Sequence, residues 1–202
     1  GLSVENHLED HSEIQPELKI IGGNYVNTSE YRYPYFASLD FACGGALISP
    51  SIVLSAAHCN GTSLVSVGVQ DILEIFFGDF IEVEMELIHP RYGEGASGFA
   101  FDVMLLKLAE PLDQPYIELN FDEDVPNVDD RLWVMGFGDT EPLKVVPPEF
   151  PFTLKEVELG YVPPEECDAA YGYNLIEESM MCTTTTNNQA PCQGDSGGPL
   201  IL

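Results

Sequence analysis

Residues 192–200 have the sequence CQGDSGGPL, in which Ser196 stands between an aspartate and two glycines. A serine on such a tight loop keeps its hydroxyl accessible, and small neighbours allow backbone N–H groups to converge on an oxyanion. The segment therefore indicates a nucleophile loop. By itself it is equally compatible with a structural turn, because glycine-rich stretches that contain serine are common in loops.

A serine hydroxyl is a weak nucleophile and needs a general base within hydrogen-bonding distance. The chain contains four histidines. His7 and His11 lie in an acidic N-terminal stretch, and His89 precedes a proline, which is typical of a structural residue. His58 lies in the apolar segment LSAAHC (residues 54–59) and is the candidate base, although a histidine near the end of a strand can also be a packed core residue.

A candidate for the third member of a triad is Asp102, which opens the segment DVMLLKL and leads into an apolar run. A buried carboxylate is costly without a partner. The N–H group of a histidine is a suitable partner, and orienting that histidine is the role of the acid in a catalytic triad. The residues His58, Asp102 and Ser196 are therefore compatible with nucleophilic catalysis.

These three motifs resemble those of the chymotrypsin-like (trypsin-like) serine proteases. The order histidine, aspartate, serine is similar to that family and differs from the orders in subtilisins and α/β-hydrolases. Residues 19–23 (KIIGG) resemble the family's activation site, and residues 41–48 (FACGGALI) resemble its first core strand. The resemblance extends over residues 19–202. It implies two six-stranded antiparallel β-barrels, the second incomplete, with an active site in the cleft between them.

Strand patterns dominate the chain and favour an all-β fold. Residues 81–87 alternate apolar side chains with glutamates, which predicts a half-buried strand with a charged outer face. Residues 51–54 and 132–135 are typical of buried strands. A short helix is predicted over residues 164–170, where proline and glutamate occupy the first turn.

Four segments make up the predicted organisation. Residues 1–19 form an acidic pro-segment, and residues 20–112 form the first barrel. Residues 113–120 connect the barrels within a stretch rich in proline and acidic residues. Residues 121–202 form the second barrel, which we expect to be truncated at its C-terminal end.

The resemblance also implies a role for each candidate site residue. Ser196 is the nucleophile, His58 the general base and acid, and Asp102 the group that orients the imidazole. The backbone N–H groups of Gly194 and Ser196 form the oxyanion hole.

Zymogen activation is a further implication of the resemblance. Cleavage after Lys19 by an activating protease would free the amino group of Ile20, which would then pair with Asp195. A carboxylate beside the nucleophile needs such a neutralising partner if it is buried. The alternative is that Asp195 is a solvated turn residue.

Primary specificity in this family depends on a pocket whose floor residue lies six positions before the nucleophile. In this chain that residue is Ala190. Because alanine cannot attract an arginine or lysine side chain, the resemblance implies cleavage after an apolar residue.

The chain contains five cysteines. By resemblance, Cys43 pairs with Cys59 and Cys167 pairs with Cys182. Cys192 is left unpaired, either as a free thiol or because its partner lies downstream of this sequence. Disulfides persist in oxidising compartments, so we expect a secreted, extracellular protein.

The acidic residues number 34 against 7 lysines and arginines, which gives a formal net charge of −27. Phosphates would be repelled, so nucleic acid is excluded as a partner, and no apolar run reaches the length of a membrane span. The charge is compatible with cationic substrates, a saline medium or simple solubility. Triad chemistry needs no metal or organic cofactor.

The expected protein is therefore a monomeric serine endopeptidase that hydrolyses protein or peptide substrates through an acyl-enzyme. An activating protease and proteinaceous inhibitors are its candidate partners. Two other hypotheses stay open: a non-catalytic protease homologue that binds or regulates, and an inactive truncated fragment.

Overall fold

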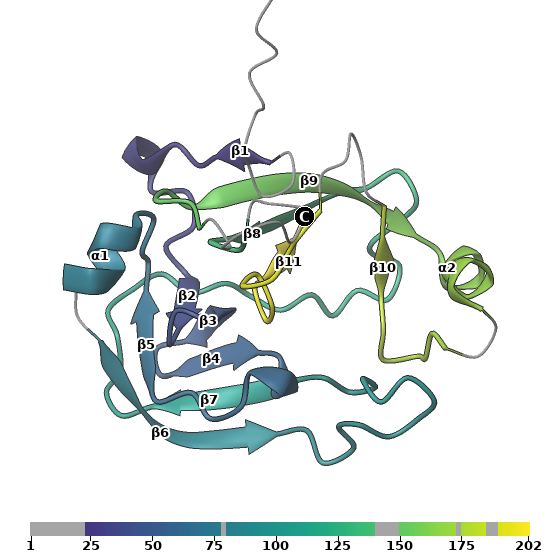
Figure 1. The fold of residues 1–202 in the computed structure, drawn as a ribbon, viewed down its shortest axis with the longest axis horizontal. Coiled ribbons are helices and arrows are strands. Elements are labelled where there is room, and N and C mark those ends of the chain that lie inside the picture. The colour runs from purple at the N-terminus through teal and green to yellow at the C-terminus, as the bar shows by residue number, and fades with distance from the viewer. Residues whose placement is uncertain (1–22, 78–79, 140–149, 173–174, 185–189) are drawn as a thin grey trace, which may run out of the picture.

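Two β-rich units joined by a long irregular connection form the computed structural model of this chain (Figure 1). The structure describes residues 23–77, 80–139, 150–172, 175–184 and 190–202. The predicted pro-segment of residues 1–19, with Lys19 and Ile20, lies outside the described residues.

The first unit is a closed barrel of six antiparallel strands. They are β2 (Phe36–Leu39), β3 (Cys43–Ser49), β4 (Ile52–Ser55), β5 (Leu64–Val67), β6 (Ile81–Ile88) and β7 (Met104–Leu108). Hydrogen bonding follows the order β2-β3-β4-β7-β6-β5, and β5 pairs again with β2 to complete the ring. The all-β prediction and the predicted first barrel are confirmed. Closure leaves no free strand edge, and the interior holds an apolar core.

The second unit is a sheet with five described strands. Strands β1 (Asn24–Tyr25), β9 (Lys155–Val162), β8 (Arg131–Gly136) and β11 (Leu200–Ile201) lie in that order, and β10 (Cys182–Thr183) also pairs with β9. Strand β1 falls within the segment predicted as the first barrel, yet it pairs with β9. The chain therefore contributes to the second unit before it builds the first.

Short helices connect some of these strands. Helix α2 (Pro164–Tyr171) confirms the predicted helix, with proline at the N-terminal end and two glutamates in the first turn. The short 3-10 helices are η1 (Thr28–Glu30) and η2 (Ala57–Cys59). Helix α1 (Ile72–Phe77) was not predicted, although Asp71 and Glu74 carried its signal. Their side chains accept hydrogen bonds from backbone N–H groups at the start of the helix, as in a capping box.

The strand predicted over residues 81–87 exists as β6, but its alternation reverses midway. The pairing register with β7 shifts between Val83 and Met85. Beyond that bulge Met85 and Leu87 are 55% and 61% exposed, whereas Glu86 is half-buried and accepts hydrogen bonds from two backbone N–H groups. An extra residue exchanges the two faces of a strand. The prediction that Met85 and Leu87 face the core is therefore wrong.

A buried cluster joins the two units. Its members come from both: Val26, Tyr33, Phe36, Val69, Met135 and Leu154. Beside this cluster the Arg32 guanidinium and the Tyr33 hydroxyl both donate hydrogen bonds to the Glu156 carboxylate on β9. Burial and this hydrogen bond raise the pKa of the Tyr33 hydroxyl above its ordinary value. These contacts hold the units together and so position residues from one unit against residues from the other.

Candidate active site

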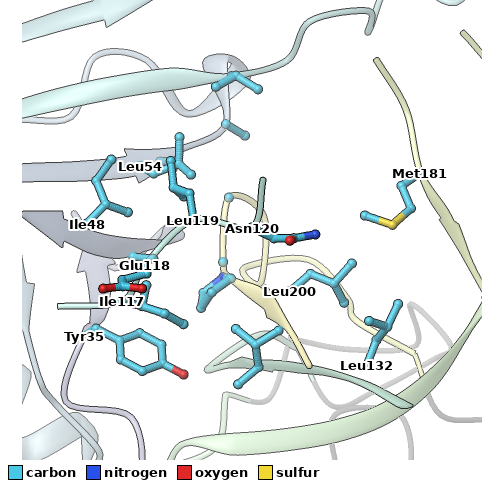
Figure 2. A pocket seen from close by; sticks show the side chains of 18 of the residues that line it. Tyr35, Ile48, Leu54, Ile117, Glu118, Leu119, Asn120, Leu132, Met181 and Leu200 are labelled. Carbon is cyan, nitrogen blue, oxygen red and sulfur yellow. The ribbon is translucent and has the colours of Figure 1, made fainter. Parts of the chain in front are cut away.

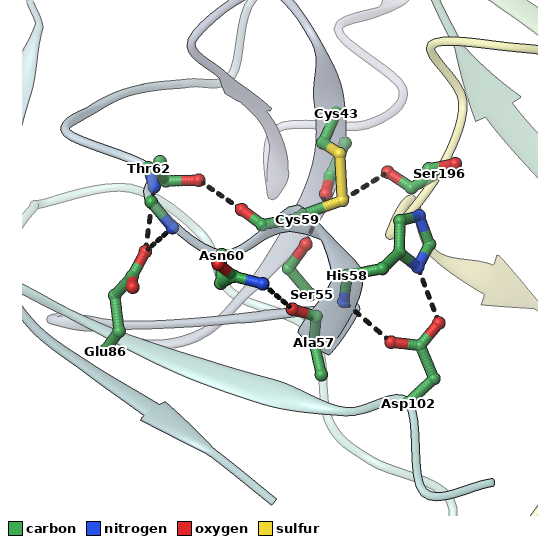
Figure 3. Close-up of a disulfide and its surroundings, with 12 residues drawn as sticks. Cys43, Ser55, Ala57, His58, Cys59, Asn60, Thr62, Glu86, Asp102 and Ser196 are labelled. Atoms are coloured by element: carbon green, nitrogen blue, oxygen red, sulfur yellow. Dashed lines mark hydrogen bonds and ion pairs between the residues drawn. A yellow bond between two sulfur atoms is a disulfide. The ribbon is translucent and has the colours of Figure 1, made fainter. Parts of the chain in front are cut away.

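His58 and Asp102 are brought together by two paired strands of the first barrel. Strand β4 ends at Ser55 and the chain turns through η2, which carries His58, while Asp102 lies two residues before β7. The two strands pair with Ser55 opposite Met104. Nδ1 of His58 lies 2.6 Å from Oδ2 of Asp102, and the backbone N–H of His58 donates to Oδ1 at 2.8 Å (Figure 3).

This double contact fixes both the carboxylate and the imidazole. A carboxylate is an acceptor only, so the hydrogen-bond network assigns the proton of the neutral imidazole to Nδ1. Nε2 is then unprotonated and able to accept a proton. Figure 3 shows the imidazole between the carboxylate of Asp102 and Ser196.

The segment before Asp102 is held by an aromatic stack that no local sequence pattern indicated. Phe101 adopts a left-handed conformation with φ +55°. Its ring stacks on the His89 imidazole at a centroid distance of 4.9 Å, and the Arg91 guanidinium lies 4.0 Å from its centroid. The backbone N–H of Phe101 donates to the Ser179 hydroxyl at 3.0 Å. His89 therefore has a packing role, as its sequence context indicated.

Ser196 comes from the second unit and is anchored to the first barrel. Its carbonyl oxygen accepts a hydrogen bond from the backbone N–H of Gly44 at 2.7 Å and lies 3.7 Å from Sγ of Cys59. The Cys59 sulfur in turn lies within 4.8 Å of a ring nitrogen of His58. The three candidate catalytic residues, predicted from segments far apart in the sequence, are thus brought to one place.

Glycines allow this close approach. A Cβ atom on Gly197 would lie 2.7 Å from the Gly44 carbonyl oxygen and closer still to the Ser55 hydroxyl. A Cβ atom on Gly44 would lie 2.9 Å from the Cα of Gly198. The nucleophile loop can therefore lie against the barrel only because these positions have no side chains.

Asp195 is buried beside Ser196, with 5% of its surface exposed. Its carboxylate accepts hydrogen bonds from the backbone N–H groups of Gly138 at 2.7 Å and Cys192 at 2.8 Å. Side chains at Gly136 and Gly138 would collide with it. Burial raises the pKa of the Asp195 carboxyl above its ordinary value, although these hydrogen bonds act in the opposite direction. The alternative that Asp195 is a solvated turn residue is therefore wrong. The two glycines at positions 136 and 138 were the sequence signal for this burial, because they leave space for the carboxylate.

The backbone N–H groups of Gly194 and Ser196 flank the buried Asp195. Neither donates a hydrogen bond to any residue that the structure describes. Gly194 has φ +102°, a conformation that favours glycine. The loop therefore presents two backbone donors that are available to a ligand.

Both disulfides implied by the resemblance are present, Cys43–Cys59 and Cys167–Cys182. Cys192 is in no disulfide within the described residues. The side chains of Cys43, His58 and Cys59 bring three potential metal-ligand atoms within 4.8 Å of one another. Because the two sulfurs are joined to each other, they are not the thiolates that metal ions bind.

Two cavities lie next to these residues. The larger, of about 680 Å³, has Asp102 in its wall and is lined mainly by apolar side chains of both units, among them Leu54, Leu132 and Leu200 (Figure 2). The smaller, of about 200 Å³, borders Gly194 and is lined mainly by phenylalanine rings. Ala190 is not among the residues that line either cavity, and residues 185–189 just before it lie outside the described residues.

Comparisons with known proteins agree on one family. The Trypsin family model matches residues 20–202. Serine protease harobin of Hydrophis hardwickii is 30% identical over 207 residues, which cover 100% of this chain and 76% of that protein. Human kallikrein-10 is 31% identical over 180 residues, which cover 85% of this chain and 64% of that protein. The solved structure of neuropsin, a serine protease expressed in the limbic system of mouse brain, superposes with a TM-score of 0.73 at 28% identity, covering 85% of this chain and 78% of neuropsin.

Proposed function

Because this chain belongs to the trypsin family of serine proteases, we propose that it hydrolyses peptide bonds through an acyl-enzyme formed on Ser196. The observation that carries the proposal is the 2.6 Å contact between His58 Nδ1 and Asp102, with Ser196 anchored nearby from the other unit. A non-catalytic homologue has no need to maintain this arrangement.

The proposed first half-reaction is acylation. The Ser196 Oγ attacks the carbonyl carbon of the scissile peptide bond, and its proton moves to Nε2 of His58. The tetrahedral intermediate collapses, the carbon–nitrogen bond breaks, and the imidazolium returns the proton to the leaving amine. Water then attacks the acyl group by the same route, with His58 again as base and acid, and releases the acid product and free Ser196.

Asp102 supports each proton transfer. Its carboxylate receives the Nδ1 proton and directs Nε2 towards the reacting hydroxyl. When the imidazole becomes positively charged, the carboxylate at 2.6 Å stabilises that charge. The Asp102 side chain is only 21% exposed, which limits its contact with water and strengthens this electrostatic interaction.

The oxyanion of the tetrahedral intermediate would be bound by the backbone N–H groups of Gly194 and Ser196. Their lack of a partner among the described residues supports this role, because donors that are already oriented require no rearrangement during the reaction. Because Asp195 lies between these two residues, the position of its buried carboxylate affects the direction of both N–H groups.

Activation is proposed to follow cleavage after Lys19. The burial of Asp195 supports this step, because a buried carboxylate is stabilised by a positive partner. The amino group of Ile20, freed by an activating protease, would provide that positive charge and stabilise the ordered nucleophile loop.

Proteins or peptides are the substrates that family membership implies. With Ala190 at the floor of the primary pocket, we expect the residue before the scissile bond to be apolar. In the described residues Arg32, Arg91, Lys107 and Arg131 each form an ion pair with a carboxylate. This pairing leaves little positive charge for nucleic acid and favours partners without a phosphate backbone.

Secretion is the compartment that the two disulfides favour, because such bonds persist under oxidising conditions. Within the described part of the chain, none of the helices is long and apolar enough to cross a membrane. We further expect a monomer that is subject to proteinaceous inhibitors.

Labelling with a fluorophosphonate probe tests the proposed function. The full-length protein, cleaved by a protease specific for lysine, should acquire one probe molecule, and peptide mapping should place it on Ser196. Ser196→Ala should abolish labelling and His58→Ala should slow it by orders of magnitude, whereas the exposed control Ser63→Ala should react like the parent. A folded, cleaved parent that takes up no probe would contradict the catalytic proposal and favour a binding role.

A further inference from the structure

Lys155 is a fully buried lysine that the proposed mechanism does not use. It is the first residue of β9 and has 0% of its surface exposed. Its ammonium lies 4.5 Å from the ring centroid of Tyr25, an attractive contact between a cation and an aromatic face. Lysine is almost never fully buried unless its charge is compensated, so this position indicates a specific electrostatic role.

The register of the sheet places Lys155 near Asp195. Lys155 is directly opposite Gly136 on β8. Directly opposite residues in antiparallel strands project from the same face with Cβ positions about 5 Å apart. Gly136 has no side chain, and the Asp195 carboxylate occupies the space that its Cβ would fill. The buried ammonium and the buried carboxylate therefore belong to one face of the sheet, one strand apart.

The acidic neighbours of Lys155 on its own strand face the other way. Successive side chains of a strand alternate between its faces. Val157 and Leu159 are buried on the face of Lys155, whereas Glu156 accepts hydrogen bonds from Arg32 and the Tyr33 hydroxyl. Lys155 and Asp195 lie on the same face of the sheet, and the positive charge of Lys155 acts to lower the pKa of the Asp195 carboxyl, which burial raises.

We propose that Lys155 is a positioning residue whose buried ammonium serves as an internal counter-charge for Asp195 and keeps the nucleophile loop ordered before the chain is cleaved. The proposal rests on the proposed function. Its consequence is that the uncleaved protein has measurable activity, because part of the positive charge otherwise supplied by the Ile20 amino group is already inside the fold. Cleavage then increases an existing activity.

The test uses the full-length protein with Lys19→Gln, which a lysine-specific activator cannot cleave at that site. In this background the fluorophosphonate should label Ser196 at a measurable rate. Lys155→Met, which keeps the length of the side chain and removes the charge, should lower that rate by about tenfold or more. Lys155→Arg should retain most of it. Lys107→Met, at a half-exposed lysine on β7, is the matched control and should leave the rate unchanged.

The same variants in the cleavable chain separate the two proposals. After cleavage the Ile20 amino group supplies the charge, so Lys155→Met should then label within about threefold of the parent. If the cleaved parent is labelled but the Lys19→Gln protein is not, the role of Lys155 is refuted while the proposed function stands. Equal labelling rates for the Lys19→Gln protein with and without Lys155→Met would also refute the role of Lys155. If even the cleaved parent is not labelled, the proposed function fails first.

Urea denaturation checks that each variant is folded in the labelling assay, so that a lower labelling rate is not caused by unfolding. Lys155→Met should unfold at a lower urea concentration than the parent, because removing one partner of a buried charge pair leaves the Asp195 carboxylate uncompensated, so labelling rates are compared without urea, where both proteins are folded. If Lys155→Met does not fold, the Lys155→Arg variant and the labelling of the Lys19→Gln protein itself still decide the matter.

Discussion

Replacing Gly197 with alanine tests whether the nucleophile loop functions only when it lies against the first barrel. Gly197 has φ +76°, and its added methyl group would lie 2.7 Å from the Gly44 carbonyl oxygen. The methyl group and the barrel cannot share this space. The expected response is withdrawal of the loop, which breaks the hydrogen bond from the Gly44 N–H to the Ser196 carbonyl.

The magnitude follows from two contributions. An alanine in the left-handed region costs about 1–2 kcal/mol. Loss of a hydrogen bond to a buried group costs about 1–3 kcal/mol. The free energy of unfolding of Gly197→Ala should therefore fall by about 2–5 kcal/mol, a large part of the stability of an ordinary domain.

Gly98→Ala is the matched control, because Gly98 has φ +73° and a Cβ there would meet no atom within 4 Å. It carries the backbone strain without the collision and should lose only about 1–2 kcal/mol. Urea denaturation measures both changes, and the rate of fluorophosphonate labelling reports the loop. Gly197→Ala should lose labelling as well as stability. The reasoning is refuted if the two variants lose the same free energy and Gly197→Ala is labelled at the parental rate.

Three further predictions concern the surroundings of the site. Phe101→Asn keeps a residue that tolerates the left-handed conformation but removes the aromatic stack, so kcat should fall with KM unchanged. Phe101→Tyr should retain the kcat of the parent, and equal kcat values for the two variants would exclude a role for the stack in positioning Asp102. The raised pKa of Tyr33 means that the folded state holds the hydroxyl proton more tightly than the unfolded state, so the free energy of unfolding should fall as the pH rises above about 10. In urea denaturation at several pH values, Tyr33→Phe should show a smaller fall than the parent. Replacing Cys43 and Cys59 by alanine opens a bond between residues 16 positions apart and should lower the free energy of unfolding by about 3 kcal/mol; an unchanged urea midpoint would contradict this.

Several features were determined by short segments of the sequence. Neighbouring residues alone were enough to predict the strand over residues 132–135, the helix over residues 164–170 and the loop around Ser196. Alternation, capping residues and glycine content carry that information, because each acts within a few positions along the chain. The resemblance of separate motifs to one family then predicted the disulfide partners, and both bonds are present.

Tertiary structure decided the features that depend on register and contact. The bulge in β6 turned Met85 outward and Glu86 inward, although the local pattern predicted the reverse, because pairing with β7 and not alternation sets the face of each residue. The placement of Lys155 opposite Gly136, and of Asp195 in the space that Gly136 leaves, likewise arises from strand pairing and from a loop far along the chain. Short motifs were enough to identify the residues that could perform the chemistry. Only the closure of the barrel against the second sheet decided their distances and their burial, because both depend on atoms remote in sequence.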